Sequence, residues 1–96
     1  MIKYSYVYII TNKWNTVLYI GVTSDLIIRT YKHKEKFYSS FSSKYNLSKL
    51  VWFEVYEDIV EAIKREKHIK SGSRKKKVDL INALNPKWDD LYDRLF

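Results

Sequence analysis

The chain has 96 residues, a formal net charge of +7, nine tyrosines and no cysteine. Its length predicts one domain, residues 1–96, and the lack of cysteine excludes disulfide scaffolds, thiolate zinc sites and cysteine nucleophiles. No apolar run approaches ~18 residues, and residues 1–4 do not resemble a signal peptide, so we expect a cytoplasmic protein without a membrane partner. The positive charge predicts a polyanionic partner.

Two short strands open the predicted fold. Residues 4–11 and 17–22 are rich in β-branched and aromatic residues, and five polar residues join them into an antiparallel hairpin. Strand alternation puts the aliphatic side chains on one face and Tyr6, Tyr8 and Tyr19 on the other. Tyrosines on strands often serve only packing, and that interpretation stays open beside a catalytic one.

Two features of the next stretch point toward the tyrosine face. Gly21 would lie on that face of its strand, where an isolated glycine predicts a close approach by another group. A helix is predicted over residues 25–36, with Arg29 and His33 four residues apart and therefore neighbours on one side. Ile27 and Tyr31 have the same spacing, and we expect this pair to face the core.

The remaining elements complete a β-β-α-β-α-α order. A polar loop over residues 37–48 precedes a strand at residues 50–56 and helices at 58–70 and 74–84. The strand should alternate, with one face carrying Val51, Phe53 and Val55. We expect an α/β (α+β) domain with one three-stranded antiparallel sheet flanked by helices, and a tail at residues 87–96 that packs on it.

An acid interrupts the apolar stripe predicted for the helix at residues 58–70. On a helical wheel Glu66 falls in the middle of the stripe formed by Ile59, Ala62, Ile63 and Ile69. A carboxylate in that position is unfavourable unless it is paired or used. It could make a structural ion pair, or it could hold Mg²⁺, which one or two carboxylates bind together with waters and phosphates.

Cationic residues gather in the same part of the chain. The predicted nucleic-acid-binding residues are Lys64, Arg65, Lys67, Lys70, Arg74, Lys75, Lys76 and Lys77. The last four open a helix, where the macrodipole disfavours positive charge, so a bound anion would relieve the repulsion. An ordinary solvated helix face is the alternative. With the tyrosines, Arg29 and Glu66, the chain contains a base, a cationic stabiliser and a metal ligand, the parts that metal-assisted phosphodiester hydrolysis requires.

An ordered series of short motifs runs along almost the whole chain. Residues 6–8 read Tyr-Val-Tyr, residues 19–21 read Tyr-Ile-Gly, and Arg29, Glu66 and the Asn-Pro pair at 85–86 follow. In this order the series resembles the GIY-YIG nuclease superfamily, and most of all small single-domain members similar to the nuclease domain of the excision-repair incision subunit. Tyr6 stands where the motif has its first glycine, a departure that bears on the shape of the substrate site.

The resemblance implies a function as well as a fold. Members of the superfamily are endonucleases that cleave DNA with Mg²⁺ or Mn²⁺, some of them in DNA repair or processing. Related nucleases often carry an extra DNA-binding domain, so we expect weak, sequence-poor binding here or recruitment by a protein partner. A nucleic-acid-binding module with little catalysis and a basic protein-interaction domain are the alternatives.

The resemblance also implies roles for individual residues. Tyr8 would be the general base, and Tyr19 would position water or the scissile phosphate. Arg29 would stabilise charge on the phosphoryl group, and His33 would assist the base. Glu66 would hold the metal ion.

A late asparagine supports the site in many members of the superfamily. Asn85 is the expected residue, and Asn82 competes with it because Asn85 lies further from Glu66 than the pattern suggests.

Overall fold

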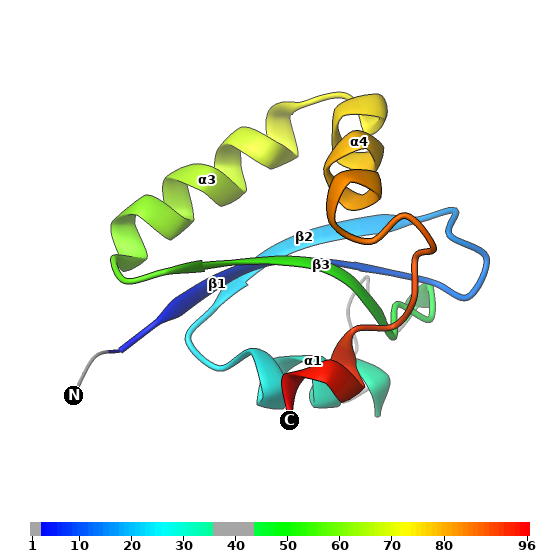
Figure 1. Ribbon diagram of the computed structural model, residues 1–96, viewed down its shortest axis with the longest axis horizontal. Helices are drawn as coiled ribbons and strands as arrows, with labels where there is room; N and C mark the ends of the chain where they lie inside the picture. Colours follow the sequence, from blue (N-terminus) through cyan, green and yellow to red (C-terminus); the bar gives the residue numbers. More distant parts are fainter. Residues whose placement is uncertain (1–2, 36–43) are drawn as a thin grey trace.

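A three-stranded sheet lies between two helical layers in the computed structural model, which describes residues 3–35 and 44–96 (Figure 1). The elements are β1 (Ser5–Thr11), β2 (Leu18–Thr23), α1 (Leu26–Lys34), β3 (Lys49–Tyr56), α3 (Ile59–Ser71), α4 (Arg74–Leu84) and the 3₁₀ helix η1 (Tyr92–Leu95). The predicted α+β class and the β-β-α-β-α-α order are confirmed. Most of the loop predicted over residues 37–48 lies outside the described residues. In the described ranges, no helix is long and apolar enough to cross a membrane.

The sheet is antiparallel, with the strand order β2-β1-β3. Because β1 is central and covered on both faces, all of its residues from Val7 to Thr11 are fully buried. The two faces carry different clusters, as alternation predicts. One cluster contains Val7, Ile9 and Ile20 and faces α3 and α4, and the other contains Tyr8 and packs toward α1 and the tail.

A β-bulge interrupts the side-chain alternation that was predicted for β3. Ile9 pairs with Trp52 and Ile10 pairs with Leu50, so Val51 is an extra residue opposite the step between them. The extra residue shifts the side-chain alternation, and Val51 joins Trp52 in the α3-facing cluster. Phe53 packs on the tyrosine side, so the prediction that Val51 and Phe53 share a face was wrong.

The layer formed by α3 and α4 covers the aliphatic face of the sheet (Figure 1). Ala62 and Ile69 of α3 and Ile81 of α4 are buried against it. The predicted stripe of α3 was too wide, since Ile59 and Ile63 are 46% and 38% exposed. The helix therefore packs on the sheet mainly through the small side chain of Ala62 and through Ile69 near its C-terminal end. In this position α3 lies against β2 as well as β1.

On the opposite face, α1 covers the tyrosine side of the sheet (Figure 1). Its N-cap is Asp25, whose carboxylate accepts a hydrogen bond from the amide of Ile28 at 3.0 Å. The buried residues of α1 are Leu26, Thr30 and His33. Ile27 and Tyr31 are 36% and 47% exposed, so the prediction that this pair faces the core was wrong. The helix is rotated so that a histidine takes an inner position.

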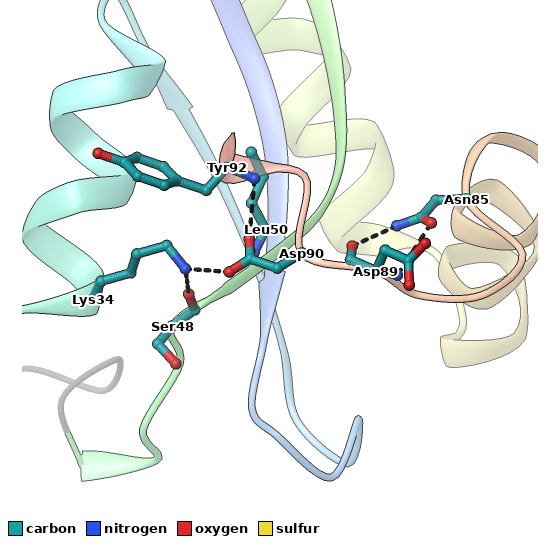
Figure 2. A network of polar contacts seen from close by, with 7 residues as sticks. All are labelled: Lys34, Ser48, Leu50, Asn85, Asp89, Asp90 and Tyr92. Atoms are coloured by element: carbon teal, nitrogen blue, oxygen red, sulfur yellow. Dashed lines mark hydrogen bonds and ion pairs between the residues drawn. The ribbon is translucent and has the colours of Figure 1, made fainter. Parts of the chain in front are cut away.

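The tail fastens α1 to β3 (Figure 2). The ammonium group of Lys34 donates to the carboxylate of Asp90 and to the carbonyl of Ser48, the latter at 2.8 Å. The same carboxylate accepts from the amides of Leu50 at 3.2 Å and Tyr92 at 3.1 Å. One aspartate therefore holds the end of α1, the start of β3 and η1 together.

Candidate active site

The deepest part of the candidate site is the contact between Tyr8 and Gly21, which are directly paired across β1 and β2. A Cβ atom added at Gly21 would lie 2.4 Å from the Tyr8 hydroxyl oxygen. The close approach predicted at Gly21 is therefore made by the phenol of the neighbouring strand. No larger residue fits at position 21 without moving that phenol.

The Tyr8 hydroxyl lies 3.3 Å from Nε2 of His33, in a buried hydrogen bond between β1 and α1. The rings of Tyr8, Tyr19 and His33 form a compact cluster with centroids 5.8 to 6.5 Å apart. Burial and the neighbouring Arg29 guanidinium lower the pKa of His33 to about 4. The imidazole is therefore neutral at pH 7, and its Nε2 can accept a hydrogen bond from the Tyr8 hydroxyl when Nδ1 carries the ring hydrogen.

The two phenols differ in exposure. The side chain of Tyr8 is completely buried, whereas Tyr19 is half-buried and lies on the edge strand β2. In this arrangement Tyr19 is the phenol that a water molecule or a phosphate can contact directly. Tyr8 lies behind it and contacts His33.

Lys70 connects the tyrosines to Glu66, although α3 and α1 lie on opposite faces of the sheet. Its Nζ lies 3.6 Å from Oε1 of Glu66 and 5.9 Å from the centroid of the Tyr19 ring. Because β2 is an edge strand, the Lys70 side chain can pass around it from the α3 face. Lys70 thus links Glu66 to Tyr19 at the β2 edge, and the Tyr19 ring in turn neighbours those of Tyr8 and His33.

Glu66 has the properties of a carboxylate that could hold a divalent cation. Its side chain is only 14% exposed, and in this structure it is ion-paired with Lys70. Within residues 3–35 and 44–96 there is no cluster of three or more His, Cys, Asp or Glu side chains. The donor set therefore fits a metal such as Mg²⁺, which accepts one protein carboxylate with waters and phosphate oxygens, and does not fit a fully protein-coordinated ion.

The structure does not bring the two candidate asparagines to this group. Asn85 is buried at the end of α4, where its Nδ2 donates to the carbonyl of Val51 at 3.1 Å. The same nitrogen donates to the carbonyl of Asp89 at 2.8 Å (Figure 2). It thus supports the bulge on β3, at the edge of the sheet opposite β2. Asn82 is exposed, and its Oδ1 accepts from the indole of Trp88 at 2.7 Å. Each of these side chains thus makes a structural contact, and the catalytic role expected of Asn85 stays a prediction.

The eight predicted DNA-binding cations are spread over several surfaces. Lys64, Arg65 and Lys75 are paired with Glu61, Glu54 and Asp79 respectively. Arg74 is hydrogen-bonded to carbonyls of the β1–β2 loop. The others are Lys67, Lys70, Lys76 and Lys77. Much of the positive charge thus has partners within the chain. The unfavourable interaction of cations with the N-terminus of α4 is therefore partly compensated by these contacts.

A cavity of about 420 Å³ opens between α3 and α4 and is separate from the tyrosine group. Its lining includes the apolar residues Ile69 and Leu80 and the cations Lys76 and Lys77. None of the six predicted catalytic residues lines it. The cavity is therefore not the place where the predicted catalytic residues lie.

Two structural contributions were missed in the sequence. Lys70 was predicted only as one of several DNA-binding cations, and its place between Glu66 and Tyr19 was not predicted. The i, i+4 spacing from Glu66 was the available signal. The clamp between Lys34 and Asp90 joins residues 56 apart, and no local pattern signals such a contact.

Comparisons with known proteins identify the family of the chain. The family model described as the GIY-YIG catalytic domain matches residues 4–79. The UPF0213 protein SSP2268 of Staphylococcus saprophyticus is 35% identical over 77 residues, which cover 80% of this chain and 93% of the relative. The solution NMR structure of the UPF0213 protein BH0048 from Bacillus halodurans superposes with a TM-score of 0.58 at 26% identity, covering 91% of this chain and 92% of that one.

The fold and the family match define a small single domain of the GIY-YIG type. The chain belongs to the GIY-YIG catalytic domain family and is similar to the small UPF0213 proteins within it.

Proposed function

We propose that this protein is a divalent-metal-dependent endonuclease that hydrolyses phosphodiester bonds in DNA. The observation that carries the proposal is the position of the Lys70 ammonium group. It lies 3.6 Å from the Glu66 carboxylate and 5.9 Å from the Tyr19 ring centroid. A carboxylate from one face of the sheet and a phenol from the other thus share one lysine as a neighbour, which supports a joint site at the β2 edge.

We assign different tasks to the two phenols because they differ in burial. Tyr19, half-buried on the edge strand, is placed to contact the attacking water or the scissile phosphate. Tyr8, fully buried, holds a hydrogen bond to neutral His33 behind it and keeps the ring cluster in position. If Tyr8 is instead the general base, as the family resemblance implies, its hydroxyl must become accessible when DNA binds and must first release its own proton to solvent before it can accept one from water.

The cationic groups of the edge match the charge of the substrate. Arg29 lies close enough to His33 to lower the pKa of the imidazole, so it carries its charge to the rim of the ring cluster. There it would stabilise negative charge on a phosphoryl oxygen. Lys70 pairs with Glu66 in the unbound protein, and its side chain is half exposed. It would move to a phosphate when a metal ion binds the carboxylate.

Glu66 would hold the metal ion. A bound Mg²⁺ or Mn²⁺ would polarise the scissile phosphate and stabilise the leaving oxygen. The carboxylate is largely shielded from solvent by its position on α3, so few waters compete for it. The setting in DNA repair or DNA processing, and targeting by a partner protein, belong to the same proposal and rest on the family resemblance.

Nicking of supercoiled plasmid in Mg²⁺ or Mn²⁺ tests the proposal. We expect Glu66→Gln to reduce the nicking rate at least ~100-fold, since removal of one group that stabilises transition-state charge has an effect of that order. Glu61→Gln is the matched control, because Glu61 is an exposed acid on the same helix that also pairs with a lysine. Equal activity of the two variants would remove Glu66 from the metal site.

The full burial of Tyr8 favours one alternative, a nucleic-acid-binding module with little catalysis. This module would bind DNA with strong salt dependence through its lysines and arginines. Binding without nicking across a range of metal ions would establish the alternative and refute the nuclease proposal.

A further inference from the structure

A large aromatic side chain stands exposed at the tip of the β1–β2 loop, residues 12–16. Trp14 is 73% exposed, whereas Trp52 is almost fully buried and Trp88 is half-buried. Single exposed apolar residues are common on proteins and need no explanation by themselves. The structure of the loop that carries Trp14, however, does require an explanation.

The loop is held rigid by its own side chains. The Asn12 carboxamide accepts from the amide of Thr16 at 2.8 Å and donates to the Thr16 hydroxyl at 2.7 Å. Its backbone carbonyl accepts from the amide of Asn15 at 3.0 Å. Asn15 has a φ of 57°, a left-handed conformation that asparagine adopts more easily than most residues. Asn12, Asn15 and Thr16 are thus fixed around an indole that makes no contribution to the core clusters.

A second anchor comes from the start of α4. The guanidinium of Arg74 donates to the carbonyl of Asn15 at 3.0 Å and to that of Thr16 at 3.1 Å. This places a permanent positive charge directly beneath the loop. The ammonium of Lys13 lies 5.1 Å from the Trp14 ring centroid. The tip therefore combines a flat aromatic ring, a fixed backbone and two cations.

This combination is suited to binding a single strand of nucleic acid. Proteins that hold unpaired strands stack bases on aromatic rings and contact the phosphates with nearby cations. We propose that Trp14 stacks on an unpaired base, and that the loop marks the junction between a duplex and a single strand next to the cleavage site. The proposal rests on the proposed function and names the substrate class, a branched or frayed DNA.

The distance between the loop and the site makes the proposal quantitative. Trp14 precedes Tyr19 by five residues, and an extended chain rises about 3.3 Å per residue, so the two lie within ~17 Å. A DNA strand advances about 3.4 Å per nucleotide. The cleaved bond should therefore lie within about five nucleotides of the junction.

The binding test uses forked DNA with 2-aminopurine as the first unpaired base, titrated with the full-length protein in EDTA so that no cleavage occurs. We expect stacking to quench the probe, and Trp14→Ala to weaken binding of the fork by roughly 5- to 150-fold while leaving binding to a blunt duplex unchanged. Trp14→Phe should retain part of the effect. Phe96→Ala is the control, because Phe96 is an equally exposed aromatic, 79% exposed, elsewhere on the chain.

The outcomes separate this inference from the nuclease proposal. A loss with Trp14→Ala that is equal on fork and duplex, or no loss, overturns the stacking role even if plasmid is nicked. A fork-specific loss together with no cleavage in any metal refutes the nuclease and leaves the stacking role standing. With Mg²⁺ present, cuts mapped more than about five nucleotides from the junction contradict the placement of Trp14.

Discussion

The buried His33 makes the stability of this protein depend on pH in a way that one substitution can isolate. Its pKa is lowered from 6.5 to about 4 by burial and by Arg29. Because the folded value lies below the unfolded one, the unfolded chain takes up the proton first as the pH falls. Stability is therefore complete above about pH 7 and declines toward pH 4.

The size of the effect follows from the two pKa values. Between pH 7 and pH 5, protonation of the unfolded imidazole alone should lower the free energy of unfolding by about 2 kcal/mol. The groups around the ring are Arg29 on the same helix, Tyr8 on β1 and Tyr19 on β2. The decline thus belongs to His33, together with a background from the carboxylates of the whole chain.

Urea unfolding at pH 7 and pH 5 separates His33 from the background. His33→Asn removes the titrating ring, and its decline should be smaller than that of the wild type by about 2 kcal/mol, whatever its absolute stability. His68→Asn is the control, because His68 is an exposed histidine on α3 and its removal should leave the decline unchanged. A His33 ring signal in NMR that titrates near pH 6.5 would refute the burial argument.

Two further predictions concern the packing that supports the site. Gly21→Ala should destabilise the protein by about 1–3 kcal/mol in urea unfolding, because its Cβ would lie 2.4 Å from the Tyr8 hydroxyl. Gly72→Ala is the control: its Cβ would lie 3.4 Å from its nearest neighbour, so stability should change by less than about 1 kcal/mol. Asp90→Ala should lower the free energy of unfolding by about 2–3 kcal/mol and weaken nicking, because it releases the end of α1. Asp93 is an exposed acid of η1, so Asp93→Ala should change the free energy of unfolding by less than about 0.5 kcal/mol. Equal effects of each pair would contradict the structural roles assigned here.

The strands and the division of the sheet faces could be predicted from sequence because they depend on local alternation. The hairpin placed Tyr8 and Tyr19 on one side and the aliphatic residues on the other, and the structure has this arrangement. The bulge at Val51 could not be predicted in the same way. An inserted residue is a property of the pairing between strands, and the sequence of a single strand does not reveal it.

The helix faces show a similar limit. Ile27 and Tyr31 are more apolar than His33, so hydrophobic periodicity assigns them to the core. The structure instead buries the histidine, because the Tyr8 hydroxyl beneath α1 can satisfy it. A polar partner on another element decided the rotation of the helix, and periodicity contains no information about such partners. For the same reason, the meeting of Lys70 with Tyr19 across the β2 edge became visible only in three dimensions.

The clamp on Asp90 has a consequence for the order in which the protein forms during synthesis. Tyr8, Tyr19 and His33 are made first, but the last turn of α1 is secured by a residue 56 positions after Lys34. Contacts between residues so far apart close only after most of the chain is available. A ribosome-bound chain that stops before Asp90 would therefore carry all the proposed catalytic residues. It would lack the aspartate that holds the end of α1 in place. We conclude that the proposed site of a nascent chain is completed only after Asp90 has been synthesised.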